Sequence, residues 1–272
     1  MNNFLFIIPL TPDSILNEER IHLRKLCFDA LINQSYGNWQ ALLIGESSNY
    51  THSDPRFIKI NFEGKKEEKL QIATAHILTQ KIQSDYLIRL DDDDIINPNI
   101  LEKLKTASFD VYSDCWHSFF HMASGKISQQ VRVWFPNTCI QKTAHALTIF
   151  GEFPKGEITH FKPAPYLIEN DHSSFHKYYT NRHNVLFSQK KNPIYLRAIG
   201  SSSITAKNAN DYNQYLQSFG YWKSNRLTNF SFLNTNIVCP PPTKQNLITY
   251  FEALLLNIKL SRNYLSVLLS KS

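Results

Sequence analysis

Four consecutive carboxylates, Asp91–Asp94, form the group in this chain whose residue types and spacing most clearly suggest chemistry. They follow the apolar run 86–90, whose aromatic and β-branched members predict a strand. Adjacent carboxylates repel one another unless solvent or a cation relieves them, and Mg²⁺ prefers such oxygen ligands, often together with substrate phosphates. The group therefore indicates either a site for a metal and a phosphate, or a solvated acidic turn that Asn97 and Pro98 complete.

The elements around this group alternate between strands and helices. Apolar runs with the length of buried strands occur at 4–10, 39–44, 57–62 and 86–90. Helical periodicity predicts helices at 18–33 and 67–83, with another opening at Asn97 and Pro98. This alternation predicts an α/β fold with a mostly parallel central sheet and helices on its faces. Ligands of such sheets gather at the carboxyl ends of the strands, which favours the metal and phosphate interpretation.

The second half of the chain has a less regular pattern. Short strands are predicted at 110–113, 131–135 and 193–199, and helices at 141–150 and 171–181. The tail, 246–270, predicts one long helix with basic and many apolar residues. Such a helix could lie on an anionic membrane surface, dock on the rest of the chain or pair with a second copy, and we favour docking.

Composition limits the classes of function. A hydrophobic share of 42% and a charged share of 19% in 272 residues are ordinary for a globular protein. The net charge of +6 suits nucleic acid, anionic lipid or phosphorylated small molecules. Lys and Arg are spread along the chain rather than clustered, so we expect no nucleic-acid partner.

Cysteine spacing and hydropathy indicate the compartment. The four cysteines are widely separated and form no C-x-x-C pair, which predicts buried, reduced thiols: Cys27, Cys115, Cys139 and Cys239. The first apolar run is short and has no basic residues before it, so we do not expect a signal peptide. No apolar run approaches the roughly 20 residues of a membrane span. We expect a cytoplasmic protein, with peripheral contact at the inner membrane face as an alternative.

Three passages, in this order along the chain, resemble a known family. They are Phe6-Ile7-Ile8-Pro9, then 31–36 followed by 39–44, then Leu90–Asp94 with Pro98. Together they resemble the nucleotide-sugar-binding half of a GT-A glycosyltransferase, close to family 2 and to predicted rhamnosyltransferases. The resemblance covers residues 4–105 well and the remainder in patches.

The resemblance implies a domain organisation and an activity. A GT-A catalytic domain would span 1–242, with a nucleotide-sugar-binding half at 1–105 and an acceptor half at 106–242, before a C-terminal helix at 243–272. The implied reaction is metal-dependent, inverting transfer of a sugar from a nucleotide-diphosphate donor of UDP or dTDP type. A hydroxyl of a glycan or lipid-linked acceptor would receive the sugar, in surface polysaccharide synthesis.

The resemblance also implies the donor and metal residues. Asp91 and Asp93 fall on the D-x-D positions, so Asp91 would approach the ribose and the metal, and Asp93 would bind Mn²⁺ or Mg²⁺ at the diphosphate. Pro9 and Asp92 would lie on the donor side, and Asp92 and Asp94 would support the other two carboxylates. The family's second strand ends with two Asp residues, whereas this chain has Glu46 there, which could accept a hydrogen bond from a uracil-type base.

The second half of the chain matches the family's pattern less closely, but it contains candidate catalytic, metal-binding and acceptor-binding residues. Asp171 is the best match to the family's catalytic base, with Glu169 as the second choice, although Asp171 could simply cap the helix that follows. His172 could be a third metal ligand or an ordinary histidine. Trp116 and Trp134 could stack on an acceptor sugar or belong to the core.

Two other functions remain open at this point. The altered 45–48 loop is compatible with a GT-A-like binding domain that has lost activity. An Asp-dependent phosphoryl-transfer enzyme also places two carboxylates after a strand, but the residues that follow Asp93 and the position of the strand within the chain fit that class poorly.

Overall fold

The computed structural model describes most of the first two hundred residues and short pieces beyond them. The described ranges are 1–46, 52–114, 116–131, 139–147, 184–200, 215–216, 218–220, 222–224 and 227–233. Every structural statement below concerns these ranges.

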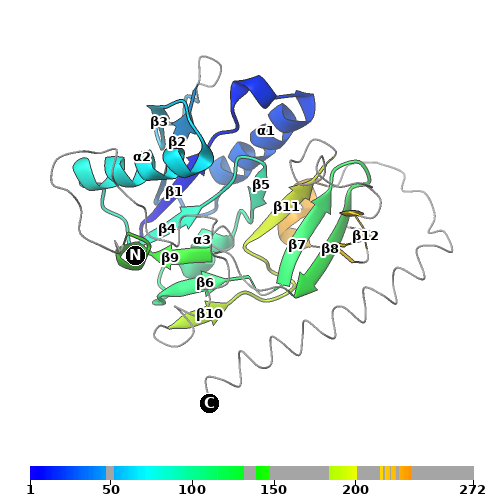
Figure 1. Cartoon of the computed structure of the whole chain (residues 1–272). Helices are drawn as coiled ribbons and strands as arrows, with labels where there is room; N and C mark the ends of the chain where they lie inside the picture. Colours follow the sequence, from blue (N-terminus) through cyan, green and yellow to red (C-terminus); the bar gives the residue numbers. More distant parts are fainter. Residues whose placement is uncertain are drawn as a thin grey trace.

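The larger of two sheets has seven strands, in the order β10-β6-β9-β4-β1-β2-β3 (Figure 1). The bounds of its strands are β1 Phe4–Pro9, β2 Trp39–Gly45, β3 Phe57–Asn61, β4 Tyr86–Arg89, β6 Val111–Ser113, β9 Cys139–Lys142 and β10 Val185–Phe187. Only β9 runs antiparallel to its neighbours in this described sheet, and the other pairs are parallel. The predicted α/β fold with a mostly parallel sheet is confirmed.

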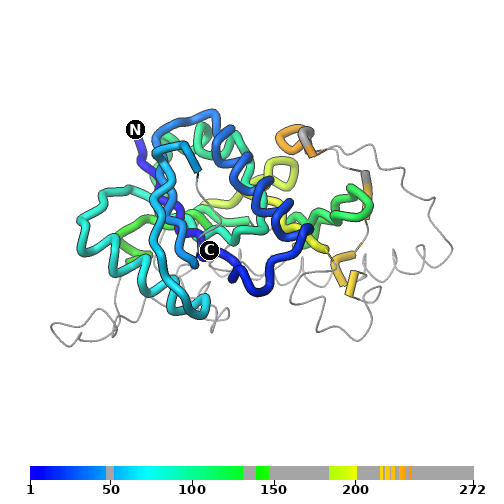
Figure 2. The backbone as a smooth tube through the Cα atoms, turned by 90° about the horizontal axis from the view of Figure 1, so that it is seen from above, coloured from blue at the N-terminus to red at the C-terminus, as the bar shows by residue number. Residues whose placement is uncertain are grey.

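The central strand β1 explains how the sheet is covered on both faces. All six of its residues are buried, as expected for a strand enclosed on both sides. Its Phe4, Phe6 and Ile8 pack with helix α1 (Glu18–Ile32), whereas Leu5 and Ile7 pack with helix α2 (Lys66–Thr79). The two helices therefore lie on opposite faces of the sheet, as Figure 2 shows from above.

Both helices begin with a polar cap, and each cap fixes the position of a basic residue in the first turn. The Asn17 side chain accepts a hydrogen bond from the Arg20 N–H at 2.9 Å, which starts α1. The Glu68 carboxylate accepts one from the Lys65 N–H at 2.7 Å, which starts α2. The first turns of α1 and α2 consequently carry Arg20 and Lys66 at fixed positions.

The second sheet has five strands, in the order β12-β8-β7-β11-β5. Its strands are β5 Asp94–Ile96, β7 Trp116–His121, β8 Lys126–Val131, β11 Tyr195–Ile199 and β12 Lys223–Ser224. Of these five strands, only β11 lies entirely within a predicted strand, 193–199. The β7–β8 hairpin was not predicted. A turn containing Gly125, whose φ is 64°, joins this hairpin, and the Ser-Gly pair there is the sequence signal that indicates it.

Several predicted boundaries are corrected. Residues 141 and 142 belong to β9 because Ile140 and Gln141 pair with β4 and β6, so the predicted helix 141–150 is wrong at its start. The remaining helices are α3 Ile100–Leu104 and α4 Thr143–Ala146, and short 3-10 turns lie at Asp13–Ile15 and Thr228–Leu233. Helix α2 ends at Thr79 rather than 83, just before Lys81, whose φ of 52° is not helical.

Some predictions lie outside the described residues. These are the helices at 171–181 and 246–270, most of the strand at 131–135, and Cys115 and Cys239. Cys27 and Cys139 are buried free thiols, as predicted. Among the described residues, none of the helices has the length and hydropathy needed to cross a bilayer.

A buried carboxyl joins β6 to the segment that leads into β11. Asp114 is fully buried and accepts hydrogen bonds from the Ser188 hydroxyl and from the Ile194 N–H, the latter at 2.9 Å and 3.0 Å to its two oxygens. Burial raises the pKa of Asp114 to about 7, although these hydrogen bonds act in the opposite direction. The protonated carboxyl is therefore the form that the fold favours below neutral pH.

This carboxyl predicts a pH-dependent stability. The folded pKa of about 7 lies above the roughly 3.9 of an unfolded Asp, so the stabilising contribution is full below pH 4 and is lost as the pH rises towards 7. Asp114→Asn keeps a neutral side chain of the same shape and should remove this loss. Urea unfolding at pH 5 and pH 8 should show a smaller difference for the variant than for the wild type, and an equal difference would contradict the assignment.

Candidate active site

The acidic turn lies where two parallel strands end. Strands β1 and β4 pair in register through Ile7 and Arg89, and the Leu90 N–H donates to the Ile7 carbonyl at 3.0 Å. The chain then turns, with the Asp94 N–H donating to the Asp91 carbonyl at 3.0 Å, and enters β5. The carboxylates consequently lie at the carboxyl edge of the parallel strands, as expected from the sequence.

Asp92 faces the protein rather than the other carboxylates. Its two oxygens accept hydrogen bonds from the Thr11 N–H and hydroxyl at 2.8 Å and 2.7 Å. Arg24 of α1 donates from Nε at 2.9 Å and makes an ion pair at 2.8 Å, and it also donates to the Thr11 carbonyl. With only 4% of its surface exposed, Asp92 ties the turn to α1 and to the residue after β1.

The other three carboxylates converge. Oxygen atoms of Asp91, Asp93 and Asp94 all lie within 4.8 Å of one another. The sequence placed Asp91 and Asp93 together and gave Asp92 and Asp94 equal, secondary roles. The structure separates these two, because Asp94 joins the cluster and Asp92 is bound to Arg24.

Cations approach this cluster from both helices. Lys66 of α2 makes an ion pair with Asp91 Oδ2 at 2.8 Å, and Arg20 of α1 lies 3.5 Å from Asp93. The second oxygen of Asp91, Oδ1, is buried and accepts no hydrogen bond from the described residues, with the Arg89 guanidinium 3.9 Å away. One carboxylate oxygen at the centre of the cluster thus remains open to a further ligand.

The three carboxyls of the cluster titrate differently. Burial alone would raise the pKa of Asp91, but the charges of Lys66 and Arg89 outweigh it and hold that pKa below its usual range. Burial and repulsion from Asp92 and Asp91 raise the pKa of Asp93 to about 6. Burial and the charge of Asp93 raise the pKa of Asp94 well above its usual value. Without a bound cation, Asp93 and Asp94 therefore hold their protons more tightly than ordinary carboxyls, and a cation would compete with these protons.

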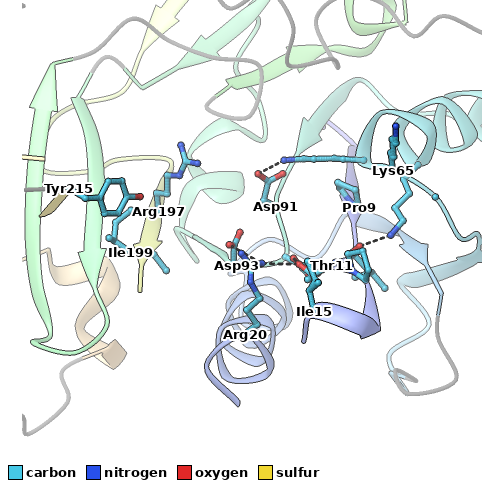
Figure 3. Close-up of a pocket in the computed structure, with 17 residues that line it drawn as sticks. Pro9, Thr11, Ile15, Arg20, Lys65, Asp91, Asp93, Arg197, Ile199 and Tyr215 are labelled. Carbon is cyan, nitrogen blue, oxygen red and sulfur yellow. Dashed lines mark hydrogen bonds and ion pairs between the residues drawn. The ribbon is translucent and has the colours of Figure 1, made fainter. Parts of the chain in front are cut away.

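A pocket of about 450 Å³ opens beside the cluster. Figure 3 shows Asp91 and Asp93 on one side of it and Arg197, Ile199 and Tyr215 on the other. Five basic residues also line this pocket, and the sequence did not single them out: Arg20, Lys65, Lys66, Lys69 and Arg197. The Gly-Lys-Lys passage at the start of α2 is the signal that could have indicated two of them, Lys65 and Lys66, since phosphates bind at helix N-termini.

Lys69 and Arg197 show how this basic lining is held. Lys69 is 1% exposed and donates to the Leu10 carbonyl at 2.9 Å; burial lowers its pKa, while Glu46 and Asp92 act in the opposite direction. Burial likewise acts to lower the pKa of Arg197, but the charges around it together outweigh burial and raise that pKa, the largest of them being that of Asp94, its register partner across β5 and β11. Both pocket walls therefore present cations near the carboxylates, the buried Lys69 on one and the half-buried Arg197 on the other.

The remaining candidate residues have different locations. Pro9 and Asp92 line the pocket. The charge of Glu46 acts to raise the pKa of Lys69. Their donor-binding role stays a prediction. The Trp116 ring is covered by the Lys190 ammonium, 3.8 Å from its centre.

The other four candidates are Asp171, Glu169, His172 and Trp134, and they lie outside the described residues.

The site fits a hard divalent cation. Carboxylate oxygens are the ligands that Mg²⁺ and Mn²⁺ prefer, and three of them meet here. The buried Oδ1 of Asp91, which has no hydrogen bond from the described residues, is an oxygen atom that could bind such an ion. Asp91 and Asp93 would hold the ion, with Asp94 beside them.

Comparisons with known proteins gave distant structural likenesses. No family model and no curated protein sequence matches this chain. Residues 1–349 of S. aureus TarS, in complex with UDP-GlcNAc, are similar with a TM-score of 0.48 and 11% identity, over 93% of this chain and 71% of that chain. Rv0371c of Mycobacterium tuberculosis H37Rv, in complex with manganese, is similar with a TM-score of 0.36 and 8% identity, over 74% and 90% of the two chains.

The apo-form glycosyltransferase GlyE of Streptococcus pneumoniae TIGR4 is similar over a smaller region. Its TM-score is 0.27 with 11% identity, over 42% of this chain and 30% of that chain. At these scores and identities the likenesses do not assign a function, so the proposal below depends on the residues of the site.

Proposed function

We propose that this protein is a metal-dependent glycosyltransferase that takes a sugar from a nucleotide-diphosphate donor. The observation that carries the proposal is the meeting of Asp91, Asp93 and Asp94 beside a pocket that Asp91 and Asp93 line together with five basic residues. Carboxylates alone suggest a cation, and lysines and arginines alone suggest an anion. Both together, at the carboxyl edge of a parallel sheet, fit a metal ion that is shared with a diphosphate.

The chemistry of sugar transfer needs what this pocket offers. Breaking the bond between the anomeric carbon and the diphosphate leaves negative charge on the phosphate, which a divalent cation held by Asp91 and Asp93 would stabilise. Lys66 and Arg197 would add fixed positive charge on either side of the same phosphates. Pro9 and Thr11, at the end of β1, would form the floor on which the donor rests.

The acceptor half of the reaction rests on the sequence resemblance. Asp171 would remove the proton from the acceptor hydroxyl as it attacks the anomeric carbon from the opposite face, with inversion. Glu169 is the second candidate for this role, and His172 is a candidate further ligand of the metal. The acceptor would be a glycan or a lipid-linked glycan, the base uracil or thymine, and the pathway surface polysaccharide synthesis.

Location and assembly belong to the same proposal. We propose a cytoplasmic enzyme without a nucleic-acid partner. Its basic C-terminal helix, 243–272, would dock on the catalytic domain, and the alternatives are contact with the inner face of the membrane or pairing with a second copy.

The donor site can be tested by thermal stability. Of the four nucleoside diphosphates UDP, dTDP, GDP and CDP, UDP or dTDP with Mn²⁺ at about 100 times Kd should stabilise the chain by about 2.7 kcal/mol. For a chain of this size that corresponds to a shift of roughly 5–10 °C in Tm. Asp93→Asn should abolish the part of the shift that requires metal, because it removes a metal ligand.

The control for this test is Asp29→Asn. Asp29 lies on α1, where it pairs with Lys25, and its side chain is 41% exposed, so its removal changes the net charge equally while leaving the pocket intact. The control should keep the full metal-dependent shift. The absence of a shift with every one of these nucleotides, with and without Mn²⁺, would refute the proposal and favour a domain without this activity.

The catalytic base can be tested separately from binding. Asp171→Asn should lower the hydrolysis of a UDP- or dTDP-sugar, measured as release of the nucleotide, by roughly 10²–10⁴-fold, the usual contribution of a general base. Asn caps helices as well as Asp does, so the substitution preserves any capping role. Nucleotide-dependent stabilisation should persist, and Glu169→Gln should have a much smaller effect on hydrolysis. Unchanged hydrolysis in Asp171→Asn would exclude Asp171 as the base.

A further inference from the structure

Lys66 pairs with one oxygen of the Asp91 carboxylate, which would also hold the metal. It is the first residue of α2, and its Nζ lies 2.8 Å from Asp91 Oδ2. Its side chain is 34% exposed, compared with 15% for that of Asp91, so the lysine reaches inwards from the pocket rim to a buried partner. Its charge is a main reason why Asp91 remains ionised despite burial.

An ammonium group and a divalent cation cannot both bind Asp91 closely without cost. Two cations on one carboxylate would lie a few ångströms apart in a partly buried site, where charges are poorly screened. In the absence of a metal, Lys66 provides the counter-charge of Asp91 and stabilises the turn. A metal ion that arrives alone must therefore bind against the repulsion of Lys66 or displace it into solvent.

A diphosphate would remove this conflict. Its oxygens carry enough negative charge to contact both the metal and the ammonium group, and so separate the two cations. The N-terminus of α2, a helix of 14 residues, adds positive potential at the same place. Gly64, Lys65 and Lys66 line the pocket there, so a bound phosphate would lie within reach of the Lys66 side chain.

We propose that Lys66 exchanges its partner when the donor binds. Its ammonium group would release Asp91 and pair with a phosphate oxygen of the nucleotide diphosphate instead. The exchange makes binding of the metal and of the diphosphate cooperative, so that each binds weakly without the other. This inference rests on the proposed function, because it requires a metal at Asp91. It adds a diphosphate-binding residue on α2 and a reason for metal and donor to enter together.

Lys65 offers a matched comparison. It precedes Lys66 directly, carries the same charge and lines the same pocket. Lys66 and Arg89 hold the charge of Asp91, whereas Lys65 makes no ion pair with the acidic turn among the described contacts. Replacing either lysine changes the net charge of the pocket equally, but only replacement of Lys66 frees Asp91.

The experiment measures Mn²⁺ binding by electron paramagnetic resonance of the free ion, for the full chain. Without nucleotide, Lys66→Met should bind Mn²⁺ about tenfold more tightly than the wild type, because a competing cation is gone. Lys65→Met should change this affinity less than twofold, and Lys66→Arg should stay near the wild type. With saturating Mn²⁺, Lys66→Met should bind the nucleoside diphosphate that stabilises the wild type best at least tenfold more weakly.

The cooperativity is obtained by comparing the variants. By linkage, the factor by which the diphosphate tightens Mn²⁺ binding equals the factor by which Mn²⁺ tightens diphosphate binding. Chelation of Mn²⁺ by the free nucleotide is the same for every variant and cancels in the comparison. Without metal, Lys66 pairs with Asp91, so the metal-free affinity for the diphosphate should stay near the wild type in Lys66→Met. The remaining factor should therefore fall about tenfold in this variant.

Two results would overturn the inference. One is an Mn²⁺ affinity of Lys66→Met within twofold of the wild type, and the other is an equal change in Lys65→Met, which would indicate a general effect of pocket charge. Failure of the proposed function gives a different result, since the wild type would then bind no Mn²⁺ in the presence of any of the four nucleotides.

Discussion

The buried ion pair between Arg24 and Asp92 is the interaction on which the geometry of the site depends. It ties the acidic turn to α1, and through Thr11 to the end of β1. Losing one partner of such a pair typically costs about 3–5 kcal/mol, because the other charge stays buried alone. Asp92 thus has a structural role, because it fixes the acidic turn to α1 and β1. The fixed turn places Asp91 and Asp93 at the pocket, where nearby cations balance their charges only in part.

Much of the first half of the fold could be predicted because its signals are local. Strands β1, β2 and β4 are continuous apolar runs, and such runs predict buried parallel strands whatever their partners are. The carboxylates follow β4 directly, so their place at the sheet edge could be predicted as well. The cap of α1 at Asn17 is a local signal of the same kind.

What could not be predicted depends on contacts between distant parts of the chain. Asp92 and Asp94 look equivalent in the sequence, and only the positions of Arg24 and Arg197 separate their roles. The basic lining of the pocket also comes from separate elements, and single lysines such as Lys66 resemble those of any exposed helix. The short strand β5 has too few residues for a period of its own, so its pairing with β11 decides its structure.

The entry of the chain into β5 at Asp94 constrains how this protein can vary. Only Leu90, Asp91, Asp92 and Asp93 connect the last residue of β4 to the first residue of β5, so the turn is also a covalent link between the two sheets. One inserted residue would shift β5 against β11 by one position and turn each of its side chains to the opposite face. Insertions and deletions are therefore expected outside this segment. The spacing from β4 to β5 is a criterion for recognising distant relatives with the same site.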